Sequence, residues 1–128
     1  MTEWIWVEPD AAIVAHREQL AEHGGGDGIR DFGLFESAMA RLRNLDAYGS
    51  PDAAALAASY AFGIACNHPF IDGNKRTAAV VGETFLTING FELKASDADL
   101  VICFLELAAG ELSEEELADW FRERIEPA

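Results

Sequence analysis

One long apolar run, AAALAASYAFGIAC from Ala53 to Cys66, constrains the fold of this chain more than any other stretch. Start signals for a helix precede it: Ser50 can cap, Pro51 suits the first helical position, and Asp52 complements the helix dipole. Because the run is apolar on every side, the helix that it predicts is buried all round.

The rest of the chain predicts further helices and little else. At 128 residues, the chain can bury one sizeable core but not two, so we expect a single domain over residues 1–128. No repeat or linker is evident, and strand signals are weak. The sequence therefore predicts an all-α fold, a compact domain of about six helices. Further helices are expected from Pro9 to Glu22, after a cap at Asp31, from Lys75 to Ile88, and after capping boxes that begin at Ser96 and Ser113. Three short segments could be extended: Trp4–Val7, Gly28–Phe32 and Phe91–Leu93.

Charge and hydropathy exclude several classes of partner. Nine Lys and Arg residues against 23 Asp and Glu give a net charge of −14, which repels nucleic acids and anionic membranes. No apolar run approaches the roughly 18 residues of a membrane span, and no signal peptide is evident, so we expect a cytoplasmic protein. Cys66 and Cys103 stand among apolar neighbours without metal-site spacing, which favours reduced thiols in the core.

Basic residues gather in one stretch of this acidic chain, NHPFIDGNKRTA from Asn67 to Ala78. Pro69 disfavours helical geometry at the residue before it, so the buried helix should end there. Gly73 can adopt backbone angles denied to other residues, and the next helix should start at about Asn74. The N–H groups of residues 73–76 are then unpaired donors at a helix N-terminus, which attracts anions, and Lys75 and Arg76 add full positive charge.

Two further side chains in this stretch suit phosphoryl or nucleotidyl transfer. Asp72 offers hard oxygen atoms, suited to Mg²⁺ that bridges phosphates. His68 is a residue type that can take a proton from a hydroxyl nucleophile at neutral pH. Each residue alone is better explained as a helix end, a cap or a solvated charge. Together, so close in sequence, they indicate a loop that holds polyphosphate.

Other polar features carry less information. The glycine-rich stretch GGGDGIRDFG, from Gly24 to Gly33, fits neither a dinucleotide-binding nor a Walker pattern, so we interpret it as a loop with at most a substrate-facing role. His16 and His23 lack partners at ligand spacing and are expected on the surface.

The motif HPFIDGNKR resembles the signature of the Fic/Doc superfamily, H-P-F-x-D/E-G-N-x-R, at every fixed position. The resemblance covers most of the chain, because GGGDGIRDFGLFESAMAR is similar to the segment that precedes and forms the flap of Doc-type proteins. FLTINGFEL is similar to the end of the helix after the motif. The resemblance implies a Fic fold with a short flap and an anion-binding loop between the central helices. The chain length is typical of death-on-curing (Doc) toxins of type II toxin–antitoxin pairs.

The resemblance also implies roles for individual residues, with ATP and Mg²⁺ as cofactors. By position, His68 matches the catalytic base and Asp72 matches the metal ligand. The phosphate-binding loop is matched by Gly73, Asn74 and Arg76, with Lys75 beside it. Phe70 matches the buried aromatic anchor of the loop.

Two positions bear on the reaction. Many Fic AMP transferases have Gly where this chain has Lys75 and a second Arg where it has Ala79, so both residues are Doc-like. A Doc-type enzyme is expected to transfer the γ-phosphate of ATP to a hydroxyl of a protein, with elongation factor Tu as the implied target. Gly73 is the more Fic-like choice, and AMP transfer is the alternative. A non-catalytic binding module is disfavoured because no catalytic position is lost.

Inhibition is expected from a separate protein. Self-inhibited Fic proteins carry a motif of the form S/T-x-x-x-E-G/N, and no Ser or Thr of this chain begins one. The resemblance implies a Phd-like antitoxin. A segment of this antitoxin would insert into a groove beside the motif and fold as it binds.

Overall fold

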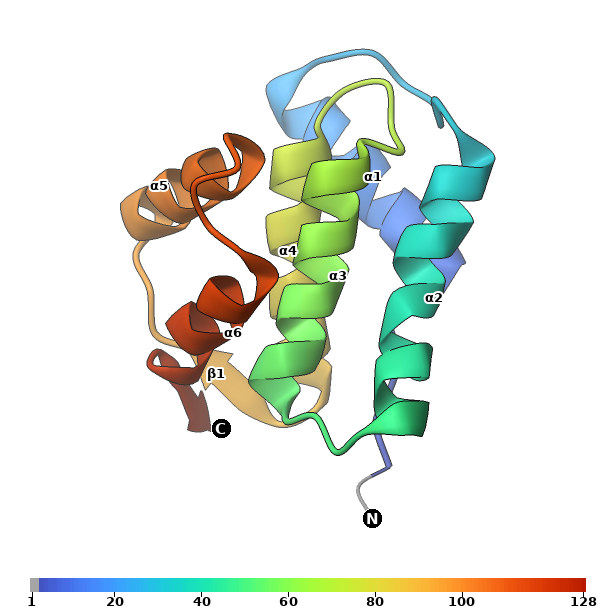
Figure 1. Cartoon of the computed structure of the whole chain (residues 1–128). Coiled ribbons are helices and arrows are strands. Elements are labelled where there is room, and N and C mark those ends of the chain that lie inside the picture. The colour runs from blue at the N-terminus through green and yellow to red at the C-terminus, as the bar shows by residue number, and fades with distance from the viewer. Residues whose placement is uncertain (1–2) are drawn as a thin grey trace.

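The computed structural model describes residues 3–128, apart from the side chain of Tyr48. Within these residues the chain forms six helices and a small two-stranded antiparallel sheet (Figure 1), which confirms the all-α prediction. The helices are α1 (Pro9–His23), α2 (Phe32–Tyr48), α3 (Ala53–Asn67), α4 (Asn74–Ile88), α5 (Asp97–Ala108) and α6 (Glu114–Arg122), and the strands are β1 (Phe91–Leu93) and β2 (Ile125–Pro127).

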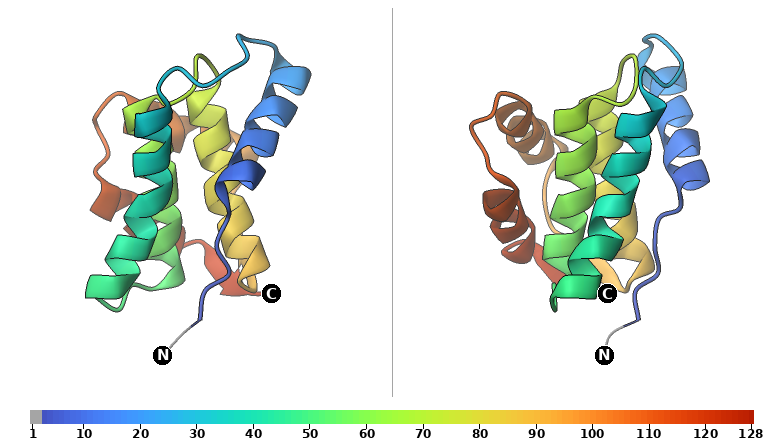
Figure 2. Two further views of the ribbon diagram at one scale, coloured as in Figure 1. Left: turned by 90° about the vertical axis from the view of Figure 1, so that its right-hand side faces the viewer. Right: turned by 45° about the vertical axis from the view of Figure 1, so that its right-hand side comes forward.

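Helix α3 lies at the centre of the molecule, as its uninterrupted apolar run predicts. It packs against α2, α4 and α6, while α1 packs on α4 (Figures 1 and 2). Small residues allow the close approach: a Cβ on Gly63 would lie 3.2 Å from the Cβ of Ala38, and one on Gly82 would lie 3.4 Å from the carbonyl oxygen of Ala57. Larger side chains at these positions would separate the helices and open the core.

Capping residues begin the helices largely where the sequence predicts. Asp31 accepts a hydrogen bond from the N–H of Leu34, and Ser113 forms a reciprocal capping box with Glu116. Ser96 accepts from the N–H of Asp99, the first half of the box expected there.

The cap of α3 differs from the prediction, because Asp52 takes the place expected for Ser50. The Asp52 carboxylate accepts from the N–H of Ala55 at 2.9 Å and from Nε of Arg122, on α6, at 2.7 Å. The hydrogen bond from Arg122 is the main cause that lowers the pKa of this carboxyl group from its ordinary value. A carboxylate fixed by an arginine is a stronger acceptor than a serine hydroxyl, so the helix begins two residues later.

Within residues 3–128 the only sheet is the antiparallel pair of β1 and β2. Leu93 of β1 lies opposite Ile125 of β2, and Phe91–Leu93 is therefore extended as predicted. The stretch Trp4–Val7 pairs with no strand in the described chain, and Gly28–Phe32 contributes only a single bridge, between Ile29 and Phe70.

The two cysteines differ in environment, so the prediction of two core thiols is wrong for one of them. Cys103 is buried, and desolvation raises its pKa to about 11. Cys66 is exposed, because the last turn of α3 emerges from the core. Among residues 3–128, no helix is both long and apolar enough to cross a lipid bilayer.

Candidate active site

The motif loop, residues 68–73, joins the two central helices at the end of the molecule where the connection from α1 to α2 also passes (Figure 1). His68 ends α3 in the left-handed conformation, with φ 48° and ψ 55°. Gly73 begins α4 with φ 75° and ψ 17°. Both boundaries follow the sequence prediction, in which Pro69 stops one helix and Gly73 starts the next.

Asn74 and Phe70 give the loop its shape. The Asn74 side chain accepts from the N–H of Phe70 at 3.0 Å and donates to the carbonyl oxygen of the same residue at 3.1 Å. The Phe70 ring is buried, so it anchors the loop in the core. The oxygen and one N–H of the Asn74 side-chain amide are used within the loop, so its backbone N–H and one side-chain N–H are left for an anion.

The start of α4 provides donors for an anion. The first N–H to enter the helical ladder is that of Thr77, which donates to the carbonyl oxygen of Gly73 at 3.0 Å. No acceptor within residues 3–128 takes the N–H groups of residues 74–76, and the side chains of Lys75 and Arg76 are exposed beside them. Free N–H groups, the helix dipole and two cations together make this end of α4 strongly attractive to anions.

All the predicted site residues line one hollow of about 450 Å³. The hollow is lined by residues of the motif loop and of the first turn of α4: His68, Ile71, Asp72, Gly73, Asn74, Lys75 and Arg76. Folding therefore brings the sequence motif together in space as one open cavity.

The Asp72 carboxylate, the predicted ligand of Mg²⁺, is exposed at the end of the motif loop. One oxygen accepts from the N–H of Gly73 at 2.8 Å, and the other faces Gly25, where an added Cβ would lie 2.8 Å from it. The described residues contain no group of three or more His, Cys, Asp or Glu side chains that could hold a metal by themselves. If Mg²⁺ binds at this carboxylate, phosphate oxygens and water would have to supply most of its other ligands.

His16 is a residue that the sequence prediction placed wrongly. It is buried, with 1% of its surface exposed, rather than at the surface. Its ring stacks on Phe70, with 3.9 Å between centroids and 7° between planes, and its Nε2 lies 2.7 Å from the carbonyl oxygen of Asp72. Its spacing of four residues from the buried Ala12 on α1 was the signal available in the sequence.

The connection before α2 also contacts the motif loop, although its sequence predicts at most a substrate-facing role. Arg30 donates from Nε to the carbonyl oxygen of His68 at 2.8 Å and from Nη2 to that of Asn67 at 3.0 Å. The backbone N–H of Arg30 donates to the carbonyl oxygen of Pro69 at 2.7 Å, and that of Ile71 donates to Gly28 at 3.1 Å.

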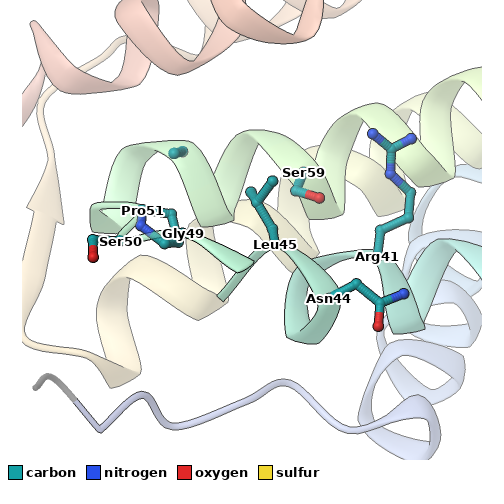
Figure 3. A pocket seen from close by; sticks show the side chains of 8 residues that line it. Arg41, Asn44, Leu45, Gly49, Ser50, Pro51 and Ser59 are labelled. Atoms are coloured by element: carbon teal, nitrogen blue, oxygen red, sulfur yellow. The ribbon is translucent and has the colours of Figure 1, made fainter. Parts of the chain in front are cut away.

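A second cavity adjoins the hollow, and a larger one lies apart from it. An apolar groove of about 290 Å³ adjoins the hollow, because Lys75 and Arg76 line both. Its other residues come from α4 and α5: Ala79, Leu100, Val101, Phe104 and Leu105. The larger cavity, about 720 Å³ between α2 and α3, is lined by Arg41 and Ser59 among others (Figure 3). Arg41 is paired with Glu114, so this cavity offers little net charge to a ligand.

Comparisons with known proteins bear on the same residues. The model of the Fic/DOC family matches residues 6–86, more than half of the chain, including the whole motif loop. The chain belongs to the Fic/DOC family. It is also 43% identical over 81 residues to a protein named Toxin Doc from Mycolicibacterium smegmatis, an alignment that covers 60% of each chain.

The part of this Fic/DOC chain that matches the family extends from the N-terminal segment through most of α4. It includes His16, Arg30 and the motif loop, whereas α5 and α6 lie beyond it. The chain thus spans about three fifths of the length of the curated relative.

Proposed function

We propose that this protein is the toxin of a toxin–antitoxin pair and that it transfers the γ-phosphate of ATP to a Ser or Thr hydroxyl of a protein. Elongation factor Tu is the proposed target, and arrest of translation is the proposed effect. The observation that carries the proposal is the hollow in which His68, Asp72 and the cationic start of α4 lie together.

Each group in the hollow has a task in this reaction. The N–H groups at the start of α4, with Lys75 and Arg76, bind the phosphates and fix them for in-line attack. The exposed His68 takes the proton from the attacking hydroxyl. Mg²⁺, held by Asp72 and phosphate oxygens, would neutralise charge on the phosphates when it is bound.

The apolar groove beside the hollow supports the alternative, AMP transfer. A purine base bound between α4 and α5 would place the nearest phosphate, the α-phosphate, over Lys75 and Arg76. The kinase reaction needs the opposite orientation, with the γ-phosphate in the hollow. Lys75 and Ala79 favour the kinase by resemblance, and the groove favours AMP transfer by geometry.

Mass spectrometry of the modified protein separates the two reactions. Phosphorylation adds about 80 Da and AMP transfer about 329 Da to the acceptor, by the composition of the groups transferred. Purified elongation factor Tu, ATP and Mg²⁺ are incubated with the wild-type chain and with His68→Ala. We expect the 80 Da adduct, and its loss or a reduction of about 10²–10⁴ in rate for the variant, because the base is removed. Equal rates for the two proteins would contradict the assignment of His68.

Control by a partner follows from the same proposal. A Phd-like antitoxin would bind in trans, with a segment that folds into a groove beside the motif. The chain should arrest growth when it is expressed alone, and co-expression of the neighbouring gene product should restore growth and give a stable complex. Harmless expression of the folded wild-type chain would argue against the toxin assignment.

A further inference from the structure

Two side chains from outside the motif contact the motif loop at its two ends. His16, on α1, contacts Asp72 near the end of the loop, and Arg30, in the connection to α2, contacts His68 at its start. We propose that His16 and Arg30 are positioning residues, which fix the base and the metal-binding carboxylate of the proposed reaction. This inference rests on the proposed function for the roles of His68 and Asp72, but its geometry does not.

The His16 contact fixes the position of the ring and places a hydrogen atom on Nε2. A carbonyl oxygen can only accept, so Nε2, 2.7 Å from the Asp72 oxygen, must carry a hydrogen atom. The parallel stack on Phe70 prevents the ring from turning, and Phe70 is itself buried. The backbone of Asp72 is thereby fixed to α1, and its carboxylate leaves the chain from a fixed point.

The Arg30 contact acts on the backbone of His68. The guanidinium donates to the carbonyl oxygens of His68 and Asn67, which are unsatisfied acceptors at the C-terminal end of α3. A cation at this end also complements the helix dipole. His68 is the only non-glycine residue of the described chain with a positive φ, so its conformation needs support from its neighbours.

The His68 side chain is exposed, and no hydrogen bond to it is found within residues 3–128. The backbone therefore sets the point and direction from which this side chain leaves the chain, and the same holds for the exposed carboxylate of Asp72, which also accepts from the N–H of Gly73. Displacement of reacting groups by about 1 Å can cost about 10²-fold in rate. Contacts that fix the backbone at both residues thus control the catalytic geometry.

Four variants test the two contacts separately. His16→Phe keeps a ring to stack on Phe70 but removes the donor, while His16→Gln keeps a donor at the position of Nε2. Arg30→Met removes both hydrogen bonds, and Arg30→Lys keeps the charge but not the forked geometry. The controls are His23→Phe and Arg17→Met, since both residues lie on α1 and are exposed.

Four quantities are measured for each variant: kcat and KM for transfer from ATP, ATP affinity by calorimetry, and amide hydrogen exchange of residues 70–74. We expect His16→Phe and Arg30→Met to lower kcat by about 10²-fold, with ATP affinity changed less than threefold in Arg30→Met. Exchange in the loop should accelerate at least tenfold in both. His16→Gln should recover most of the rate, and the two controls should behave as wild type. In wild type, nitrogen-15 NMR should find His16 protonated at Nε2.

The inference is overturned if folded His16→Phe and Arg30→Met keep wild-type kcat and wild-type exchange in the loop. If His16→Phe fails to fold, His16→Gln provides the test. Because this variant keeps a donor at the position of Nε2, a kcat and a loop exchange rate that differ from those of wild type would contradict the role of the donor. If the wild-type chain transfers no group from ATP, the proposed function fails alone. Loop exchange and the His16 tautomer then decide whether the two residues hold the loop.

Discussion

His68, the proposed base, has an unfavourable backbone conformation. A non-glycine residue in the left-handed region costs about 1–3 kcal/mol, and such residues persist where the surrounding structure determines them. Here Pro69 prevents the helix from continuing, the N–H of His68 still donates to Ile64 at 3.3 Å, and Arg30 binds its carbonyl oxygen. The imidazole is thereby turned out of the helix and into the hollow that also contains Asp72.

Thr77, one turn into α4, carries a defect that can be tested by mutation. Its side chain is fully buried, and its Oγ1 has no hydrogen-bond partner among the described residues. Thr77→Val keeps the shape and removes the unpaired hydroxyl, so we expect the free energy of unfolding to rise by about 1 kcal/mol. Urea unfolding measures this free energy. The control is Thr84→Val, because Thr84 is exposed on the same helix, and its free energy of unfolding should stay within about 0.5 kcal/mol of wild type. A loss of stability in Thr77→Val would mean that the hydroxyl is hydrogen-bonded.

Among the elements, the connection from α1 to α2 most directly affects the site. Its glycines permit close contact with the motif loop: a Cβ on Gly26 would lie 3.0 Å from Ile71 Cγ2, and one on Gly28 would lie 3.2 Å from Ile71 Cδ1. The bridge between Ile29 and Phe70 continues this contact along the backbone. The glycine-rich stretch is therefore a packing surface for the motif loop.

Gly25 allows this element to be tested against Asp72. It has φ +123°, and an added Cβ would lie 2.8 Å from Asp72 Oδ2, whereas Gly24, with φ +79°, has nothing within 4 Å of its added Cβ. Both alanine variants carry backbone strain, but only Gly25→Ala must displace the carboxylate. We expect Gly25→Ala to reduce the contribution of Mg²⁺ to ATP affinity by about tenfold, since Asp72 is the proposed metal ligand. Calorimetry with and without Mg²⁺ measures this, and equal losses in the two variants would indicate strain alone.

Local signals predicted the elements well, and long-range contacts explain what they missed. Asp31, Pro69 and Gly73 mark helix boundaries through their own backbone and side-chain chemistry, so they can be recognised in sequence. The burial of His16 depends on Phe70 and on Asp72, which lies 56 residues away. No local pattern identifies such a partner, and an unpaired histidine among charges reads as a surface residue.

On the scale of the whole molecule, a strongly acidic chain carries a small cationic site. Net charge −14 is spread over the chain, while Lys75 and Arg76 stand together at the hollow. The ion pairs of the described residues are mostly exposed, as Arg43 with Glu8 and Arg122 with Asp52 are, and exposed pairs contribute about 0–1 kcal/mol each. We therefore expect long-range repulsion among the remaining acidic side chains to outweigh these local attractions.

This balance predicts that added salt stabilises the fold. Screening shortens the Debye length from about 30 Å at 0.01 M to about 8 Å at 0.15 M, which weakens repulsion across the molecule more than attraction between touching pairs. We expect the midpoint of urea unfolding to rise over this range of sodium chloride. Arg122→Met, which removes the attraction to Asp52 and one positive charge, should be less stable and should gain more from salt than wild type. A midpoint that falls with salt would show that the ion pairs, rather than the excess of acid, dominate the electrostatic free energy of folding.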